Sequence, residues 1–140
     1  MRTEAWKNLQ PLRIPGGWTV LYNKLEAVEP EKLPPEDRIW LFAFTEDILH
    51  IYKDLGTRRR RQRLAIDLGW YPDGEPSGSF RLAAVLDNDW EHPLLTFSSR
   101  SRKEVVDTLE MWLFREFSGC GFMEEREADM FRRNHPVEGR

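Results

Sequence analysis

Apolar and polar residues alternate with a period of two on both sides of a turn-rich segment near the middle of the chain. The run Leu64–Trp70 carries an apolar side chain at every second position, and so does the run Phe80–Leu86. Between them, residues 71–79 are rich in Pro, Asp, Gly and Ser. This pattern predicts a β-hairpin with one buried face. It indicates the architecture and offers a polar tip for partners, but it contains no chemistry of its own.

The first run of strand character in the chain follows a turn signal near the N-terminus. Residues 15–17, Pro-Gly-Gly, are a turn signal, and Trp18–Leu25 follows as a predicted strand. Alternation along this run places Trp18, Val20 and Tyr22 on one face.

Three further segments are predicted to complete the sheet. Arg38–Phe44 is almost continuously apolar, so both of its faces must be covered and we place it centrally. Ile48–Lys53 returns beside it, and Pro93–Ser98 is the last strand. A helix within residues 37–54 is the alternative, because short apolar runs fit both structures.

The clearest helical signal begins at Ser101. Ser101 and Glu104 match a capping box, in which the Ser oxygen accepts a backbone N–H of the first turn and the Glu reaches back to the cap. Gly119 suits the end of this helix, and a second short helix is predicted over about residues 124–133. The apolar stripe of the main helix comprises Val105, Val106, Leu109, Trp112, Leu113 and Phe117.

Strands followed by helices predict an α+β fold. We expect an antiparallel sheet of about five or six strands, in hairpins or a meander, with a C-terminal helix packed on one face. The length of 140 residues fits a single domain. Residues 3–10 are predicted to form one or two helical turns, and residues 134–140 to form a frayed tail.

Composition and charge set limits on partners and location. A net charge of −3 and a pI of about 5.7 give no global preference for nucleic acid or for anionic membranes. No apolar run approaches the roughly 20 residues that span a bilayer, and the N-terminus lacks an apolar signal core, so we expect a cytoplasmic protein. Cys120 is the one cysteine, which excludes an internal disulfide.

Titratable residues offer one candidate for catalysis. The histidines, His50, His92 and His135, lack the spacing of a zinc site, so we expect no metal and no cofactor. Asp67 alternates with apolar residues in the hairpin, and an exposed cross-strand ion pair with Arg81 is favoured over a catalytic role. A small carboxylate-dependent enzyme that uses Asp67 together with His50 is the alternative.

A run of arginines is the sharpest charge feature. It comprises Arg58, Arg59, Arg60 and Arg61, with Arg63 beyond. A solvated entrance to the following strand is the first interpretation. The second is a patch that recognises carboxylates on a partner, because the guanidinium fork binds them bidentately. Nucleic acid ranks third, since the run lacks interleaved aromatic residues and the rest of the chain is acidic.

Acidic residues surround a tryptophan after the hairpin. Asp87, Asp89 and Trp90 lie in one bend, and with Asp73 and Glu75 they are predicted to form an acidic patch anchored by an aromatic ring. Such a patch suits a basic protein partner, because the ring supplies contact area while the charges steer association. A loop whose Trp90 tucks into the core is the equal alternative.

Two stretches carry a resemblance to a known class of protein. They are residues 14–23, IPGGWTVLYN, and residues 67–74, DLGWYPDG, followed by Phe80, Arg81 and Leu82. Together with the bend at residues 88–90 and the closing helix, they resemble small bacterial immunity proteins encoded beside polymorphic or contact-dependent toxins. The resemblance covers about residues 12–117. It implies a cytosolic, non-enzymatic protein that binds and neutralises a cognate toxin domain, and no motif fixes the contact residues.

The leading functional hypothesis is therefore an immunity-type protein that occludes the active surface of a toxin. The acidic patch is the first candidate for the contact and the arginine run is the second. Two alternatives remain open: the small enzyme described above, and a structural or regulatory module that self-associates as a homodimer through an edge strand.

Overall fold

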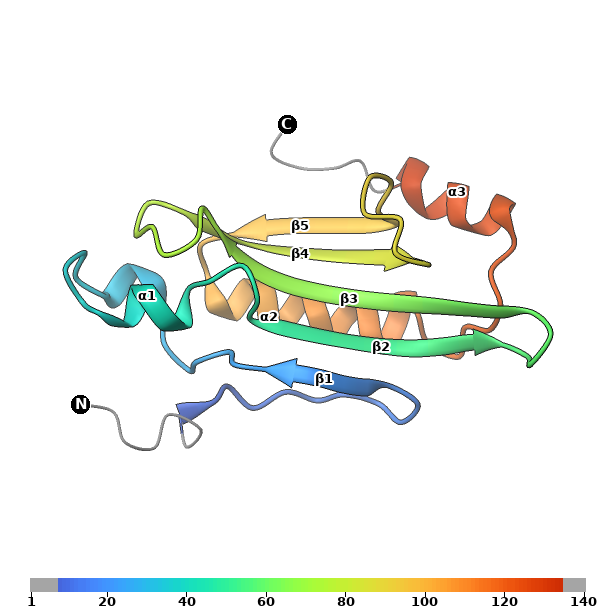
Figure 1. Ribbon diagram of the computed structural model, residues 1–140, viewed down its shortest axis with the longest axis horizontal. Helices are drawn as coiled ribbons and strands as arrows, with labels where there is room; N and C mark the ends of the chain where they lie inside the picture. Colours follow the sequence, from blue (N-terminus) through green and yellow to red (C-terminus); the bar gives the residue numbers. More distant parts are fainter. Residues whose placement is uncertain (1–7, 135–140) are drawn as a thin grey trace.

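The computed structural model describes residues 8–134, which fold around one antiparallel sheet (Figure 1). Its five strands pair in chain order, so the sheet is a meander with β1 and β5 at its edges. This confirms the predicted α+β fold and antiparallel sheet. The helical turns expected at residues 3–10 lie largely outside the described residues, as does the tail beyond residue 134. The strands are β1 (Thr19–Asn23), β2 (Leu49–Gly56), β3 (Arg61–Tyr71), β4 (Ser79–Leu86) and β5 (Leu95–Ser99).

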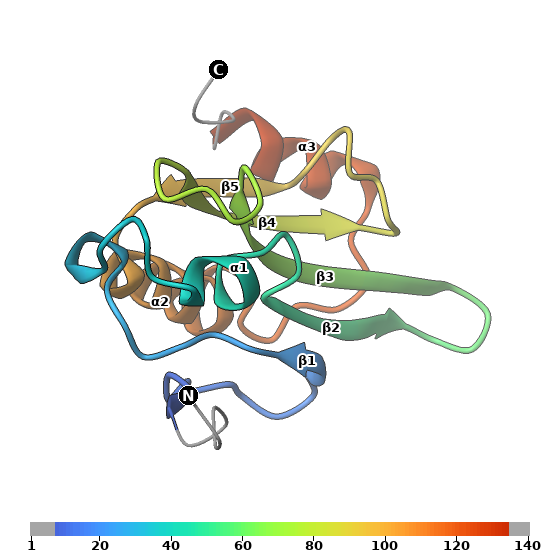
Figure 2. The same cartoon turned by 60° about the vertical axis from the view of Figure 1, so that its left-hand side comes forward.

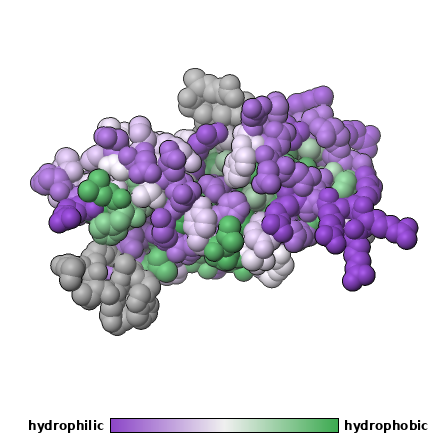
Figure 3. Space-filling model, viewed as in Figure 1, coloured by the Kyte–Doolittle hydropathy of each residue, from purple (hydrophilic) through white to green (hydrophobic). Residues whose placement is uncertain are grey.

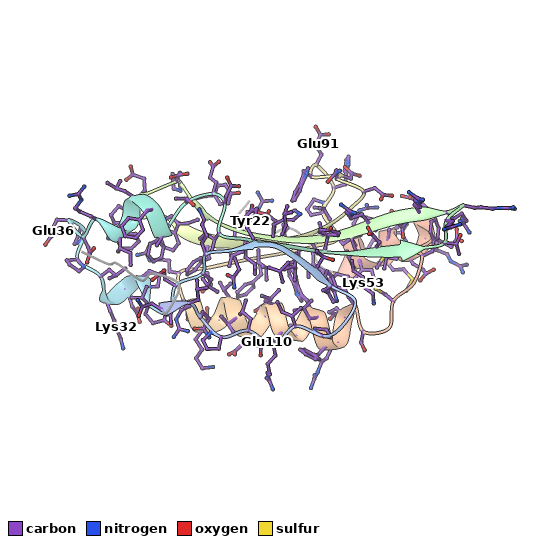
Figure 4. The ribbon with its side chains drawn as sticks, turned by 60° about the horizontal axis from the view of Figure 1, so that its bottom comes forward. Tyr22, Lys32, Glu36, Lys53, Glu91 and Glu110 are labelled. Atoms are coloured by element: carbon purple, nitrogen blue, oxygen red, sulfur yellow. The ribbon has the colours of Figure 1, made fainter. Side chains whose placement is uncertain are left out.

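One face of the sheet is covered by helix α2 (Arg102–Met111) and the π-helical turn η3 (Trp112–Glu116) that continues it. The helix lies behind the sheet in Figure 1 and beneath it in Figure 4. The core between them combines the alternate apolar residues of β3 and β4 with the predicted helical stripe, as the period-two and helical patterns require. Its most buried members include Leu64, Ile66, Leu68, Trp70, Phe80, Leu82, Leu109 and Phe117.

The predicted N-cap of α2 is confirmed for Ser101, but the Glu104 side chain has a different hydrogen-bond partner from the one expected. The Ser101 hydroxyl oxygen accepts the Glu104 N–H at 3.1 Å, as expected of a capping box. The Glu104 carboxylate instead accepts the Ser99 hydroxyl, and the Ser99 oxygen accepts the Ser101 N–H at 2.9 Å. Glu29, just before the short 3-10 turn η2 (Pro30–Lys32), adds a cap by accepting the Arg102 N–H at 2.9 Å.

The segment predicted as a central strand at residues 38–44 forms the short helix α1 (Ile39–Ala43), so that prediction is wrong and its helical alternative is right. The Asp37 carboxylate accepts the Ile39 N–H at 2.9 Å and so starts the helix. Ile39, Trp40 and Ala43 are buried at helical spacing, while Leu41 is 71% exposed. The run is apolar throughout although only one side of α1 is buried, because the solvent-facing positions of the helix also carry apolar residues.

A β-bulge in β1 overturns the predicted arrangement of its side chains. Val20 pairs with Ile51 and Tyr22 pairs with His50, so Leu21 is the extra residue. Directly paired residues share a face of the sheet. Val20 therefore lies on the face of buried Ile51, while Tyr22 lies with His50 on the opposite face. The two were expected on one face.

The chain between α1 and β2 runs tightly along β3. The Trp70 N–H donates to the Thr45 carbonyl at 2.8 Å. A Cβ built on Gly69 would lie 2.2 Å from the carbonyl oxygen of Glu46, so only glycine fits beneath this segment. This close approach brings Asp47 next to the open face of the sheet, where its carboxylate accepts the Tyr22 hydroxyl at 3.3 Å.

The C-terminal helix α3 (Glu125–Asn134) lies on the β5 side of the sheet, whereas α1 lies at the end where β3 turns into β4 (Figures 1 and 2). The buried Gln62 amide holds the approach to α3, because it donates to the Met123 carbonyl at 3.0 Å and accepts its N–H at 2.8 Å. The Arg132 guanidinium donates to the His92 carbonyl at 3.0 Å. Helix α3 is thereby joined to the loop between β4 and β5.

Candidate functional site

The face of the sheet opposite α2 is open and polar. In Figure 3, which shows this face, hydrophilic side chains dominate and project furthest at the end where β2 turns into β3. The antiparallel register places His50 directly opposite Asp67 on this face. Antiparallel sheets commonly pack one face on a core and leave the other to solvent, so the open face is the one available to a partner or ligand.

His50 and Asp67 form a hydrogen-bonded pair at the centre of the open face. The His50 Nδ1 lies 2.8 Å from the Asp67 Oδ2, and the two side chains are only 18% and 19% exposed. The rings of Tyr22 and Trp90 flank the imidazole, with centroids at 6.0 and 6.4 Å. These contacts join β1, β2, β3 and the β4–β5 loop.

The expected ion pair between Asp67 and Arg81 is not formed, and within residues 8–134 the ion pair of Asp67 is with His50. The register gives the reason. Asp67 lies opposite Ala83, whereas Arg81 lies opposite Gly69. The small Ala83 leaves space beside Asp67, and on the other side the imidazole of His50 is directly opposite.

A small pocket opens beside Asp67 on this face. Its volume is about 90 Å³, and we name it the Asp67 pocket. Trp90, 46% exposed, reaches back from the β4–β5 loop to form one of its walls. The prediction that Trp90 serves as an accessible aromatic is compatible with this position, and the alternative that it fills the core is wrong. The lining comprises Asp67, Tyr71, Arg81, Ala83 and Trp90.

The Asp67 pocket is lined by one carboxylate, Asp67, and one guanidinium, Arg81, and two more carboxylates act on it from nearby. Burial raises the pKa of Asp67, the bond and charge of His50 lower it, and Asp47 raises it. Burial also raises the pKa of Tyr71, with further upward contributions from Asp67, Glu46 and Asp47 and a downward one from Arg81. Around the Tyr71 hydroxyl, three carboxylates therefore oppose one guanidinium.

Tyr22 gives a pH-dependent test of this arrangement. Burial, Asp67 and Asp47 raise its pKa from 10.0 to about 12, so the folded protein keeps a proton that the unfolded chain releases. The stability that this provides is complete below pH 10 and is lost as pH rises to about 12. We expect Tyr22→Phe to reduce the fall in the free energy of unfolding over this window, as measured by denaturant titration. An equal fall in both proteins would contradict the placement of Tyr22 beside the two carboxylates.

The His50–Asp67 pair has the geometry of an oriented imidazole. A carboxylate on Nδ1 leaves Nε2 to accept or donate a proton, as in general-base sites. Within residues 8–134, neither residue of the pair forms a hydrogen bond with a Ser, Thr or Cys side chain, and the Tyr22 hydroxyl bonds to Asp47 instead. Burial raises the pKa of Cys120, which disfavours its thiolate. The bond from His50 thus holds the Asp67 carboxylate in one orientation where it lines the pocket.

The arginine run lies at the tip of the β2–β3 hairpin. Arg60 is bound within the fold, since its guanidinium lies 3.1 Å from a Glu124 carboxylate oxygen and 3.9 Å from the centroid of the Phe122 ring. Arg58, Arg59 and Arg61 are exposed, and their side chains form no ion pair or hydrogen bond with the described residues. Three of the four predicted residues thus present unpaired charge.

Asp87 and Asp89 of the predicted acidic patch are used within the fold. Asp87 has a φ of 50°, and its carboxylate accepts the Arg63 N–H at 2.8 Å, which fixes the loop onto β3. The Asp89 carboxylate bonds to His92 Nδ1 at 3.0 Å and lies 3.9 Å from Arg132. Their charges remain near Trp90, but one oxygen of Asp87 and both oxygens of Asp89 already have partners within the fold.

Asp73 and Glu75 do not join this patch. They lie in the β3–β4 loop, before β4, whereas Asp87 follows it. Eight residues of strand separate the two groups, which corresponds to roughly 25 Å at 3.3 Å per residue. The single acidic patch is therefore two separate groups at opposite ends of the sheet.

The described part of the chain adds two further findings. Among residues 8–134, no three His, Cys, Asp or Glu side chains come together as candidate metal ligands. The helices in this range are all too short or too polar to cross a membrane.

Comparison with known proteins supplies no relative. No family model, no curated protein and no solved structure matches the chain. The site is accordingly defined by its own geometry. The sequence indicated Asp67 together with His50 as an alternative, and Trp90 as part of a different patch, but not Tyr22 or Tyr71 as members of the site. Strand register is the signal that brings Tyr22, His50, Asp67 and Tyr71 onto one face.

Proposed function

We propose that this chain is an immunity-type binding protein that holds a toxin domain against the open face of its sheet. One observation carries the proposal: the helix-covered face forms the core, while the opposite face presents exposed aromatic rings, unpaired arginines and a pocket of side-chain size. Tyr71 and Trp90 are 39% and 46% exposed on this face. Tryptophan, tyrosine and arginine are the residues that most often dominate binding energy at protein interfaces.

The size of the Asp67 pocket favours a single side chain of a protein partner over a small-molecule substrate at this position. Small-molecule sites usually enclose about 300–1,000 Å³, whereas this pocket measures about 90 Å³. That is the space of about three water molecules at roughly 30 Å³ each. It suits one side-chain head group of a protein partner.

The proposed contact has a centre and an outlying part. The centre is the Asp67 pocket with Trp90, and the outlying part is the hairpin tip with Arg58, Arg59 and Arg61. Rim charges of this kind chiefly raise the association rate and its dependence on salt, whereas a central aromatic anchor determines how long the complex lasts. On this proposal Asp87 and Asp89 hold the Trp90 loop in place and steer a basic partner.

The proposal is tested by co-expressing the chain with the product of the neighbouring gene and titrating the purified pair by calorimetry. We expect protection from toxicity and a stoichiometric complex. Trp90→Ala is expected to weaken the complex by about 30-fold, because truncation of an aromatic anchor costs about 2 kcal/mol.

Phe114→Ala is the matched control for this substitution. Phe114 is 47% exposed, almost the same as Trp90, but belongs to the turn η3 that continues α2 on the other side of the sheet. We expect its affinity to equal that of the parent. Absence of a complex, or equal weakening by both substitutions, would refute the proposal.

A further inference from the structure

The Asp67 pocket has the composition of a receptor for a guanidinium group. Its floor is a carboxylate, since Asp67 uses Oδ2 for the bond to His50, while Oδ1 forms no hydrogen bond with any residue between 8 and 134. Two of its walls are the aromatic side chains of Tyr71 and Trp90. A planar guanidinium stacks on aromatic rings and donates to carboxylates, whereas an ammonium offers only a point charge.

We propose that the Asp67 pocket receives an arginine side chain of the partner protein, between Trp90 and Tyr71 and against the free oxygen of Asp67. This inference rests on the proposed function and names the chemistry of its central contact. The fixed bond from His50 holds the Asp67 carboxylate in one orientation before the partner arrives. Such preorganisation reduces the entropy lost when the complex forms.

Charge decides between a cationic and an anionic occupant. Arg81 also lines the pocket and by itself would attract an anion. The carboxylates that act on the Tyr71 hydroxyl are those of Asp67, Glu46 and Asp47, against the single guanidinium of Arg81. At Tyr22, on the other side of His50, the charges that act are those of Asp67 and Asp47. The surroundings therefore attract a cation overall.

The size of the pocket agrees with this occupant. A volume of about 90 Å³ accepts a side-chain head group, while the aliphatic stem extends along Ala83 toward the partner. Arginine is also enriched at the centres of protein interfaces, where its donors remain fully used.

The experiment uses the chain alone and follows the Trp90 indole N–H by NMR during titration with N-acetyl-arginine methylamide. The indole signal is assigned from its loss in Trp90→Phe. We expect a saturable shift of this signal. N-acetyl-citrulline methylamide, which has the same shape without the charge, is expected to produce no saturable shift.

Two variants with the same change in charge locate the site. Asp67→Asn is expected to weaken arginine binding by at least about tenfold, because the neutral amide cannot make the charge-assisted hydrogen bond to the guanidinium. Glu91→Gln is the matched control, because Glu91 is exposed one residue from Trp90 and points away from the sheet in Figure 4. We expect it to bind like the parent.

Three results would overturn the inference: no shift of the Trp90 indole, equal weakening by Asp67→Asn and Glu91→Gln, or a stronger response to N-acetyl-glutamate methylamide. These results differ from a failure of the proposed function. If the chain binds a toxin through Trp90 but does not bind the arginine analogue, only the proposed arginine contact is refuted. If the chain binds the arginine analogue but forms no complex with a toxin, the proposed immunity function is refuted and the proposal of a guanidinium site stands.

Discussion

Trp112→Asp is expected to leave the chain unfolded at room temperature. Trp112 is 3% exposed in the core between the sheet and the α2–η3 helix. Removing a buried tryptophan costs about 3–5 kcal/mol, and an unpaired carboxylate in its place adds several more. Domains of this size are stable by only about 5–15 kcal/mol. Circular dichroism should show loss of the folded spectrum and of the cooperative thermal transition.

Met111→Asp is the control that separates the loss of core packing from the effects of aspartate on helix propensity and net charge. Met111 precedes Trp112 in the chain but is 44% exposed on the solvent side of the helix. The same substitution there buries no charge, so we expect a cooperative transition close to that of the parent. If Trp112→Asp melted like Met111→Asp, the assignment of the helical stripe to the core would be wrong.

Gly69→Ala is expected to cause the second largest loss of stability. A Cβ at this position would lie 2.2 Å from the Glu46 carbonyl oxygen and 2.8 Å from the Tyr71 ring. The nearer atom, the Glu46 carbonyl oxygen, belongs to a segment that is hydrogen-bonded to β3 before and after the contact. The added methyl group therefore fits only if β3 and this segment move apart. We expect a cost of about 1–3 kcal/mol, the range for overpacked sites. Thermal denaturation measures it.

Gly121→Ala is the control for the loss of glycine itself. A Cβ there meets no atom within 4 Å. We expect a change of no more than about 1 kcal/mol, with stabilisation where the unfolded chain loses freedom. Similar melting of both variants would mean that the Glu46 backbone does not press on Gly69.

Local signals explain which parts of the fold could be predicted. The period-two runs of β3 and β4 and the Ser101 cap are each complete within a few residues, so sequence alone identifies them. The α1 segment is different, because its run of six apolar residues, Ile39–Phe44, satisfies a buried strand and a short helix equally. What decides it is the hydrogen bond from the Ile39 N–H to the Asp37 carboxylate and the packing of Trp40 against Trp70, at a ring distance of 5.6 Å.

The candidate site could not be predicted because it depends on the register of strand pairing, and sequence patterns do not specify the register across five strands. The bulge at Leu21 moves Tyr22 onto the open face, and the pairing of β2 with β3 brings His50 to Asp67. A shift of one residue in either pairing would separate these groups. The acidic patch failed as one surface for a related reason, since the length of β4 keeps its two halves apart.

In the arginine run, a contact with a residue distant in sequence distinguishes one arginine from its neighbours. Four consecutive arginines look equivalent in sequence, yet Arg60 pairs with Glu124, 64 positions away. Its neighbours have no such partner among the described residues. Local composition therefore predicted the charge of the hairpin tip, whereas the number of charges left for a partner required the fold.

The neighbour-to-neighbour strand order also has a consequence during synthesis. Each hairpin of the meander pairs segments that are close in sequence, so the sheet can assemble progressively as the ribosome releases the chain. Helix α2 follows all five strands, and until it emerges the apolar side of the nascent sheet has no cover. For that interval the chain resembles an aggregation-prone folding intermediate. A pause in translation just after β5 would prolong its exposure to chaperones, and rapid synthesis of the last helices would shorten it.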